Sequence, residues 1–387
     1  MTALGRYLSG TRIGCADLPG EEAKLLYGPI INKLSKTLVG TMPEKLDVAI
    51  VHTMNRYSEI SRIADRPVLI YDRYAGQLLN TLTRILYWSQ DVRTSNRFFS
   101  KVFAEQAILA GDLTGGMAGA LAHVQFQKFW NIRPAGSDAR VSLRVRLQEV
   151  FIFAHEFAHA MMTASEEFQK STRAIGDLLT EPRDGPKDRG AYKFFQERYP
   201  GRQTFKQWKQ LGEAEDAFVT DHRELLRDEV GCDDFALHMT LVTCLSMDES
   251  PEYAFEAAFL ALRNIRALAY IRRDANPASS KLPHQNTTEF RLLQVRQHRL
   301  RDAFRSVAAV YSIEKALDGF WAKLQDLSDL HDRQIDYPLL ATTLSSFKRV
   351  RRQLMKDKAV SQVRDVFEVA EWLGWDPAAK SVNYVLL

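Results

Sequence analysis

Apolar residues recur along this chain at two different spacings, and each spacing predicts a different kind of element. PVLIYDR (67–73) and LDVAIVHTM (46–54) are short runs rich in β-branched and aromatic residues, which is the pattern of strands. AGQLLNTLTRILYWSQ (75–90) spaces its leucines three and four residues apart, and GDLTGGMAGALAHVQFQKFW (111–130) becomes helical after a glycine-rich start. From residue 216 onward the helical spacing dominates. We therefore expect an α+β protein, mainly helical, with a small N-terminal sheet.

The stretch from 165 to 215 departs from this pattern. It is charged, and two prolines and two glycines cluster between residues 182 and 190. We expect an irregular insertion or lid here, because long structureless segments inside a domain are usually functional or disordered. A second change of pattern lies near 303–312. It divides the chain into a main domain over 1–305 and a helical C-terminal extension over 306–387.

The composition is that of a soluble globular protein, with 387 residues, 45% of them hydrophobic and 26% charged. The net charge of +4, from 52 basic and 48 acidic residues, does not favour a nucleic-acid partner. The most apolar stretch, 254–271, is interrupted by charged residues and predicts a buried helix without membrane association. With three cysteines and no apolar signal core, we expect a cytoplasmic protein.

A candidate metal site lies in the apolar stretch FIFAHEFAHAMM (151–162), where nine of twelve residues are apolar. His155 and His159 are four residues apart, so both imidazoles lie on one helix face and can bind one zinc ion. Glu156 would then take a proton from zinc-bound water. The alternative is a buried helix with two hydrogen-bonded histidines. That alternative leaves the buried Glu156 without a partner, which is costly.

The segment HRELLRDEVGCDDFALHMTLV (222–242) offers the third ligand. It contains two glutamates, Glu224 and Glu229, each followed four residues later by an aspartate. Glu229 is preferred, because the small residues Gly231 and Cys232 would let this helix approach the first one closely. Glu224 precedes two leucines near the polar start of the segment, and it is the alternative ligand. An ordinary amphipathic helix with a solvated acidic face is the other interpretation.

Asp233 lies on the same helix face as Glu229, one turn further along. A zinc-bound imidazole usually donates its second N–H to a carboxylate, which fixes the ring's orientation. Asp233 is the expected acceptor, and Asp228 is the next candidate.

HEFAH followed by EVGCDDFA resembles the pattern of the gluzincin peptidases, HExxH with a later ExxxD. The resemblance covers about 40 residues, and Cys232 stands where an alanine is common. It implies a zincin-like core in which His155, His159 and Glu229 hold Zn²⁺ and Glu156 is the general base.

A further segment, PHQNTTEFRLLQV (283–295), is similar to the histidine and arginine segment of CAAX-type and HtpX-like proteases. Here His284 is not followed by proline. The resemblance implies that His284 or Arg291 stabilises the oxyanion of the transition state; the alternative is a polar loop before a helix. The cytoplasmic character and the long N-terminal region also resemble the prophage Lit-type proteases.

Two functions are consistent with these patterns. The first is a zinc-dependent endopeptidase that hydrolyses a cytoplasmic protein or peptide substrate, which pairs with the edge of the N-terminal sheet. Such an enzyme could be regulated, or act in a phage or stress response. The second is a non-enzymatic, zinc-stabilised helical adaptor or sensor. In either case the C-terminal helical region could bind a regulatory partner.

Overall fold

The computed structural model of this protein describes residues 2–12, 20–37, 46–89, 91–134, 136–181, 204–276, 288–356, 373 and 384–386. Its strands are β1 (Asp47–Val51), β2 (Glu59–Ile63), β3 (Arg66–Asp72) and β4 (Tyr384–Leu386). Its α-helices are α1 (Ala3–Thr11), α2 (Gly20–Thr37), α3 (Arg73–Trp88), α4 (Val92–Leu109), α5 (Leu113–Gln125), α6 (Ala139–Ala164), α7 (Glu166–Thr180), α9 (Phe205–Asp221), α10 (Arg223–Leu245), α11 (Glu252–Ala275), α12 (Thr288–Val310), α13 (Lys315–Asp318), α14 (Phe320–His331) and α15 (Ser345–Lys356). Short 3-10 and π-helical segments are η1 (Gln127–Phe129), η4 (Asp332–Asp336) and η5 (Pro338–Leu344). The protein is thus mainly helical with a small sheet, as the sequence pattern predicts.

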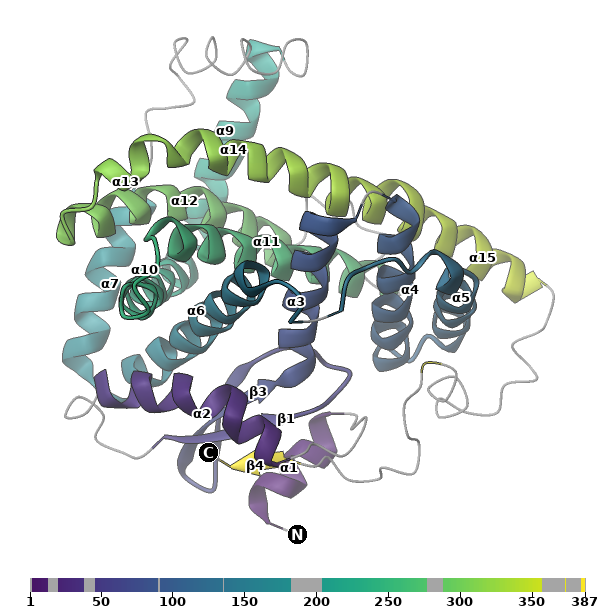
Figure 1. Cartoon of the computed structure of the whole chain (residues 1–387), viewed down its shortest axis with the longest axis horizontal. Helices are drawn as coiled ribbons and strands as arrows, with labels where there is room; N and C mark the ends of the chain where they lie inside the picture. Colours follow the sequence, from purple (N-terminus) through teal and green to yellow (C-terminus); the bar gives the residue numbers. More distant parts are fainter. Residues whose placement is uncertain are drawn as a thin grey trace.

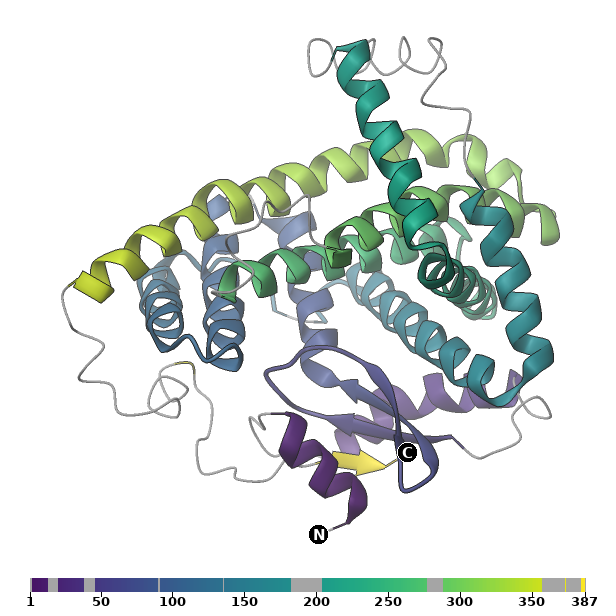
Figure 2. The same cartoon turned by 180° about the vertical axis from the view of Figure 1, so that it is seen from behind.

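The sheet lies at one end of the helical body, next to both chain ends (Figures 1 and 2). Its strand order is β2–β3–β1–β4, with β1 parallel to β3 and the other two pairs antiparallel. Successive residues of β1 point to opposite faces, so Val48 and Ile50 join the main core while Ala49 and Val51 pack with α1. The strands predicted within 46–54 and 67–73 are confirmed. β2 and β4 were not predicted.

Four helices form the centre of the molecule. α6 packs along α10, α11 and α3, and its second half is buried almost all round. Its N-terminus begins at Asp138, whose side chain accepts hydrogen bonds from the backbone N–H groups of Arg140 and Val141. A carboxylate there satisfies otherwise unpaired N–H groups and favours the helix start. The HEFAH segment therefore lies in the core on a rigid element.

The prediction of an irregular excursion over 165–215 is wrong at both of its ends. Residues 166–180 form the regular helix α7, which starts at Ser165 and packs closely on α10. The close approach depends on two glycines. A Cβ at Gly176 would lie 2.0 Å from the carbonyl oxygen of Arg227, and one at Gly231 would lie 2.4 Å from that of Thr172.

The role predicted for Gly231 is corrected accordingly, since this glycine allows α10 to approach α7 and not α6. Cys232 does pack against α6, with its sulfur 3.5 Å from that of Met162. α9 covers the other end of the predicted excursion. The prolines and glycines between residues 182 and 190, on which the lid prediction depends, lie outside the described residues.

The core is continuous across residue 305, where the sequence pattern divides the chain. α12 runs through this position, and apolar residues of α14, η4, η5 and α15 belong to the same buried cluster as those of α6 and α11. β4 also pairs with β1. No helix in the described ranges combines the length and the apolar composition that crossing a membrane requires.

A partly buried carboxyl group ties the sheet to α6. The hydroxyls of Tyr27 on α2 and Tyr71 on β3 both donate to Oε1 of Glu149, at 3.3 Å and 3.0 Å. Burial raises the pKa of Glu149 to about 7, and the two tyrosine hydrogen bonds only partly oppose this rise. Glu149 lies seven residues before Glu156, on the same face of α6.

Candidate metal centre

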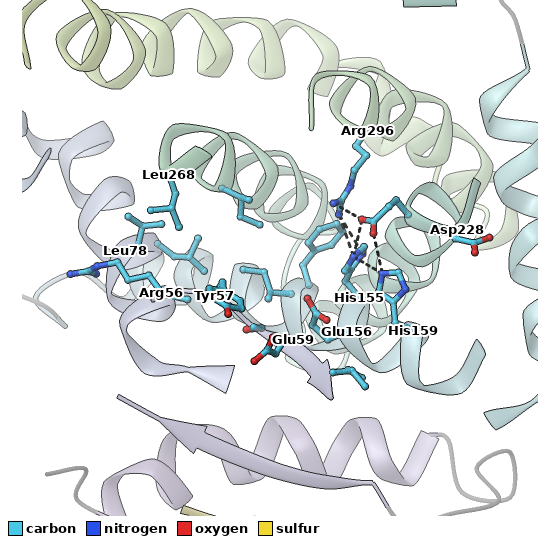
Figure 3. Close-up of a pocket in the computed structure, with 18 of the residues that line it drawn as sticks. Arg56, Tyr57, Glu59, Leu78, His155, Glu156, His159, Asp228, Leu268 and Arg296 are labelled. Carbon is cyan, nitrogen blue, oxygen red and sulfur yellow. Dashed lines mark hydrogen bonds and ion pairs between the residues drawn. The ribbon is translucent and has the colours of Figure 1, made fainter. Parts of the chain in front are cut away.

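Three side chains from two helices converge at the centre of the molecule (Figure 3). α6 carries His155 and His159, whose Nε2 atoms lie 3.1 Å apart. α10 carries Glu229, whose carboxylate oxygens lie 3.4 Å from Nε2 of His155 and 3.5 Å from Nε2 of His159. These donor atoms all lie within 4.8 Å of one another, and no other group of this kind occurs in the described part of the chain.

This arrangement fits a zinc ion in both chemistry and size. Two imidazoles and one carboxylate are the ligand set of many catalytic zinc sites. Tetrahedral bonds of about 2.0–2.1 Å place ligand atoms about 3.3 Å apart. The two nitrogens lie 3.1 Å apart, one oxygen of Glu229 lies 3.4 Å from His155 and its other oxygen lies 3.5 Å from His159, so each contact is near that value. A cation between the two imidazoles would also give their facing nitrogen lone pairs a common partner.

Asp233 lies beside the candidate ligands, as the sequence predicts. Its Oδ1 is 3.0 Å from Nδ1 of His155. An N–H on Nδ1 donates to this carboxylate, so Nε2, which faces Glu229 and His159, is the nitrogen that would bind a metal after losing its proton. Burial and Arg296 lower the pKa of His155, but its hydrogen bonds with Asp233 and Glu229 outweigh them and raise it to about 9.

Arg296 on α12 completes the centre, and sequence reasoning missed it. Its Nε and one terminal nitrogen donate to the two oxygens of Asp233 at 2.8 Å and 2.7 Å, and its other terminal nitrogen lies 2.7 Å from Glu229. Burial raises the pKa of Glu229, but Arg296 and the imidazoles outweigh it and hold that pKa well below its ordinary value. Arg296 likewise outweighs burial at Asp233 and lowers its pKa. The carboxylates of Glu229 and Asp233 are therefore both ionised, which is the form that binds a metal ion or accepts an N–H.

Glu156 lies next to the two histidines and faces a pocket (Figure 3). It has no hydrogen bond to another side chain among the described residues. Burial raises its pKa, and the neighbouring imidazoles lower it. A partly buried carboxylate with a raised pKa beside a candidate metal site has the properties expected of a general base.

The pocket has a volume of about 570 Å³ and extends from the metal centre to the start of β2 and to α3 and α11. β2 is the edge strand of the sheet, and its residues Glu59 and Ile60 line the pocket. Figure 3 shows Arg56, Leu78 and Leu268 at the end away from the histidines, with Tyr57 between that end and Glu156.

The other predicted site residues do not belong to the donor cluster. Glu224 is exposed in the first turn of α10, outside the donor cluster. Asp228 lines the pocket but forms a two-bonded ion pair with Arg173 of α7, at 2.9 Å for each bond. Arg291 lies over the ring of Phe218 and does not line the pocket, and His284 lies outside the described residues. Their role at the oxyanion stays a prediction.

Comparison with protein-family models, curated proteins and solved structures finds no match for this chain.

Proposed function

We propose that this protein is a zinc-dependent endopeptidase with a zincin-like core that acts on a cytoplasmic protein or peptide. The observation that carries the proposal is the pairing of a three-donor cluster with a neighbouring carboxylate in a pocket. His155, His159 and Glu229 have the donor types and separations that zinc requires, and Glu156 stands beside them.

Zinc held by these three residues would act as a Lewis acid that activates water and polarises a carbonyl group. Glu156 then accepts the proton of the attacking water and delivers it to the leaving amine. Asp233 holds the imidazole of His155 in one orientation, and Arg296 holds Asp233 and Glu229 in place.

The edge strand β2 offers a binding surface for an extended substrate. Its outer edge has no strand partner among the described residues, and Glu59 and Ile60 on it face the same pocket as Glu156. A peptide that adds to this edge would gain affinity from main-chain hydrogen bonds, and every second side chain of the peptide would face the pocket and supply selectivity. This explains how a protease could bind a protein segment of varied sequence.

A structural zinc site in an adaptor protein is the competing function. Structural sites are closed by four protein ligands, whereas catalytic sites keep a position open. The cluster in the described residues contains three candidate ligands and opens onto a pocket. This arrangement favours the enzyme.

Glu156→Gln and the double variant His155→Ala/His159→Ala test the proposal together. Purified wild-type protein and Glu156→Gln should each contain about one zinc per chain by elemental analysis, and the double variant should contain none. Incubation of a bacterial lysate with the wild type should create new protein N-termini that a zinc chelator abolishes. Glu156→Gln should create none of them. The same set of N-termini from both proteins, or full zinc content in the double variant, would refute the proposal.

A further inference from the structure

The far end of the pocket differs in chemistry from the metal end. Its walls are apolar and come from β2, α3, α6 and α11, with the lining residues Ile60, Ala75, Leu78, Leu79, Phe151, Ile152, Ile265 and Leu268. Tyr57 and two arginines, Arg56 and Arg272, also line the pocket. Arg272 lies one helical turn after Leu268 on α11, and Figure 3 shows Leu268 at the end of the pocket away from the histidines. A peptide that reaches from the metal centre into this end would thus meet apolar surface first and positive charge afterwards.

Most charged groups that line the pocket are neutralised within the protein. Glu59 pairs with Arg12 at 2.9 Å, and Asp228 pairs with Arg173. Arg56 is 2% exposed at its side chain, and its Nε lies 2.7 Å from a carboxylate oxygen of Glu105. These groups are therefore not available to a ligand without breaking a close ion pair.

Arg296 is neutralised as well, since it holds Asp233 and Glu229 at the metal centre. Of the cations that line the pocket, this leaves Arg272.

Arg272 is compensated less completely. Its nearest described carboxylate, that of Glu289, lies 3.7 Å away and is half-exposed. One terminal nitrogen donates to the backbone oxygen of Asn55 at 3.0 Å, so most of its five N–H donors have no described acceptor. Its side chain keeps 27% exposure, and its guanidinium lies 5.2 Å from the ring centre of Tyr57. Burial lowers the pKa of Arg272, and the carboxylate of Glu289 opposes this change only in part.

The sequence that follows α11 supplies no counter-charge either. Residues 277–287 read PASSKLPHQNT and contain no aspartate or glutamate. Their ionisable side chains are Lys281 and His284, which can only add positive charge. Among the described residues, the ion pair recorded for Arg272 is the long one with Glu289, so a carboxylate of a ligand in the pocket could approach this guanidinium more closely than Glu289 does.

We propose that Arg272 is a specificity-determining residue that binds a carboxylate group of the substrate, with an apolar substrate residue lying between this carboxylate and the metal centre. This inference rests on the proposed peptidase function. Ile265 and Arg272 line the pocket from one face of α11, about 10 Å apart along the helix axis at 1.5 Å per residue. An extended peptide covers this distance in about three residues. The carboxylate comes from an aspartate or glutamate side chain, or from the free C-terminus of a short peptide.

Fluorescent peptides of one length test this inference through binding, independently of turnover. Every peptide contains leucine at one fixed position. Aspartate, asparagine or lysine is placed at each of the remaining positions in turn, and each peptide is made with its C-terminus as a free acid and as an amide. Affinity is measured by anisotropy with zinc-loaded Glu156→Gln protein. We expect aspartate to bind about 10-fold more tightly than asparagine at one position, the preference that a charge-assisted hydrogen bond supplies. If the free acid binds better than the amide and no aspartate position does, the C-terminus is the group recognised.

Variants at Arg272, made in the same background, connect the preference to this residue. Arg272→Gln should abolish the preference for aspartate over asparagine, and Arg272→Glu should reverse it in favour of lysine. Arg272→Lys keeps the positive charge and should retain part of the preference, which gives a third test if the first two variants fold poorly. Arg305→Gln, which removes an exposed arginine of α12 outside the pocket, is the matched control and should leave the preference unchanged. Zinc content and thermal melting confirm that each variant is folded.

The outcomes separate this inference from the proposed function. If acidic, neutral and basic peptides all bind the Arg272 variants as tightly as they bind the protein with Arg272, the specificity role is refuted. The peptidase proposal is not affected by that result. If no peptide binds and the wild type cleaves none, both fail. In the wild type, recognition by Arg272 should lower KM for acidic peptides while kcat stays within about twofold, because the contact is equal in ground and transition states.

Discussion

Replacing Asp233 with asparagine is the sharpest perturbation of the metal centre. Asp233 holds two partners, Nδ1 of His155 at 3.0 Å and the guanidinium of Arg296 at 2.7 and 2.8 Å. Asparagine keeps the shape of the side chain but carries no charge. Both partners, His155 and Arg296, donate hydrogen bonds to Asp233. The NH₂ group of an asparagine side chain would also donate, so it would face one of these partners without an acceptor.

The expected weakening of zinc binding is about 100-fold, or about 3 kcal/mol, at the upper end of the usual outer-shell effect. The reason is Arg296. Without Asp233, its positive charge is balanced only by Glu229, which is itself a candidate ligand. Two like unit charges 4 Å apart repel each other by about 4 kcal/mol at an effective dielectric constant of 20. The uncompensated guanidinium of Arg296 would therefore repel a zinc ion bound at the neighbouring site.

Competition with a chromophoric chelator measures the zinc affinity, and thermal melting of the metal-free protein shows whether the fold survives. The double variant Asp233→Asn/Arg296→Gln supplies the control, because it removes the excess charge together with the carboxylate. We expect it to bind zinc about 10-fold more tightly than Asp233→Asn alone, a coupling of about 1.4 kcal/mol. Unchanged affinity in Asp233→Asn would move the orienting role to another residue. Equal affinities in the single and double variants would refute the charge argument.

Three further results are expected. Glu156→Gln should keep its zinc but lose about 10²–10⁴-fold in kcat, the range for loss of a general base, as measured with any peptide that the wild type cleaves. Because the pKa of Glu149 is raised from 4.5 to about 7 in the folded protein, its contribution to stability is present below pH 4.5 and is lost as the pH rises through 7. Glu149→Gln should therefore be more stable than wild type at pH 8, by up to about 3 kcal/mol in urea unfolding, with no such advantage at pH 4. Gly231→Ala should destabilise the protein by about 1–3 kcal/mol, because the new methyl group would meet the backbone oxygen of Thr172, and an unchanged unfolding midpoint would contradict this packing.

Local spacing was sufficient to predict much of the candidate site. His155 and His159 are one helical turn apart, so any helix through HEFAH brings their imidazoles together whatever surrounds it. The pairing of Glu229 with Asp233 follows from the same rule. The strands within 46–54 and 67–73 were also found from composition alone, because their β-branched runs occur in consecutive residues.

Features that depend on distant parts of the chain were missed. Arg296 stands 63 residues from Asp233 along the sequence, inside a helix with several other arginines, and nothing local distinguishes it from them. β2 was not predicted because EISRI is short and only partly buried, and pairing with β3 stabilises it. α7 was mistaken for part of a loop, since its buried face becomes visible only where it packs on α10.

The sequence by itself determined which residues are candidate metal ligands and that they lie on helices, because ligand spacing and helical periodicity are properties of neighbouring residues. The sequence favoured Glu229 and kept Glu224 as an alternative, and the tertiary structure decided that Glu229 meets the histidines. The tertiary structure alone brought Arg296 to both carboxylates and Arg272 to the same pocket. These three outcomes depend on how α6, α10, α11 and α12 pack against one another. That packing depends on side-chain fit and on glycines such as Gly176 and Gly231, whose contacts lie tens of residues away in the chain.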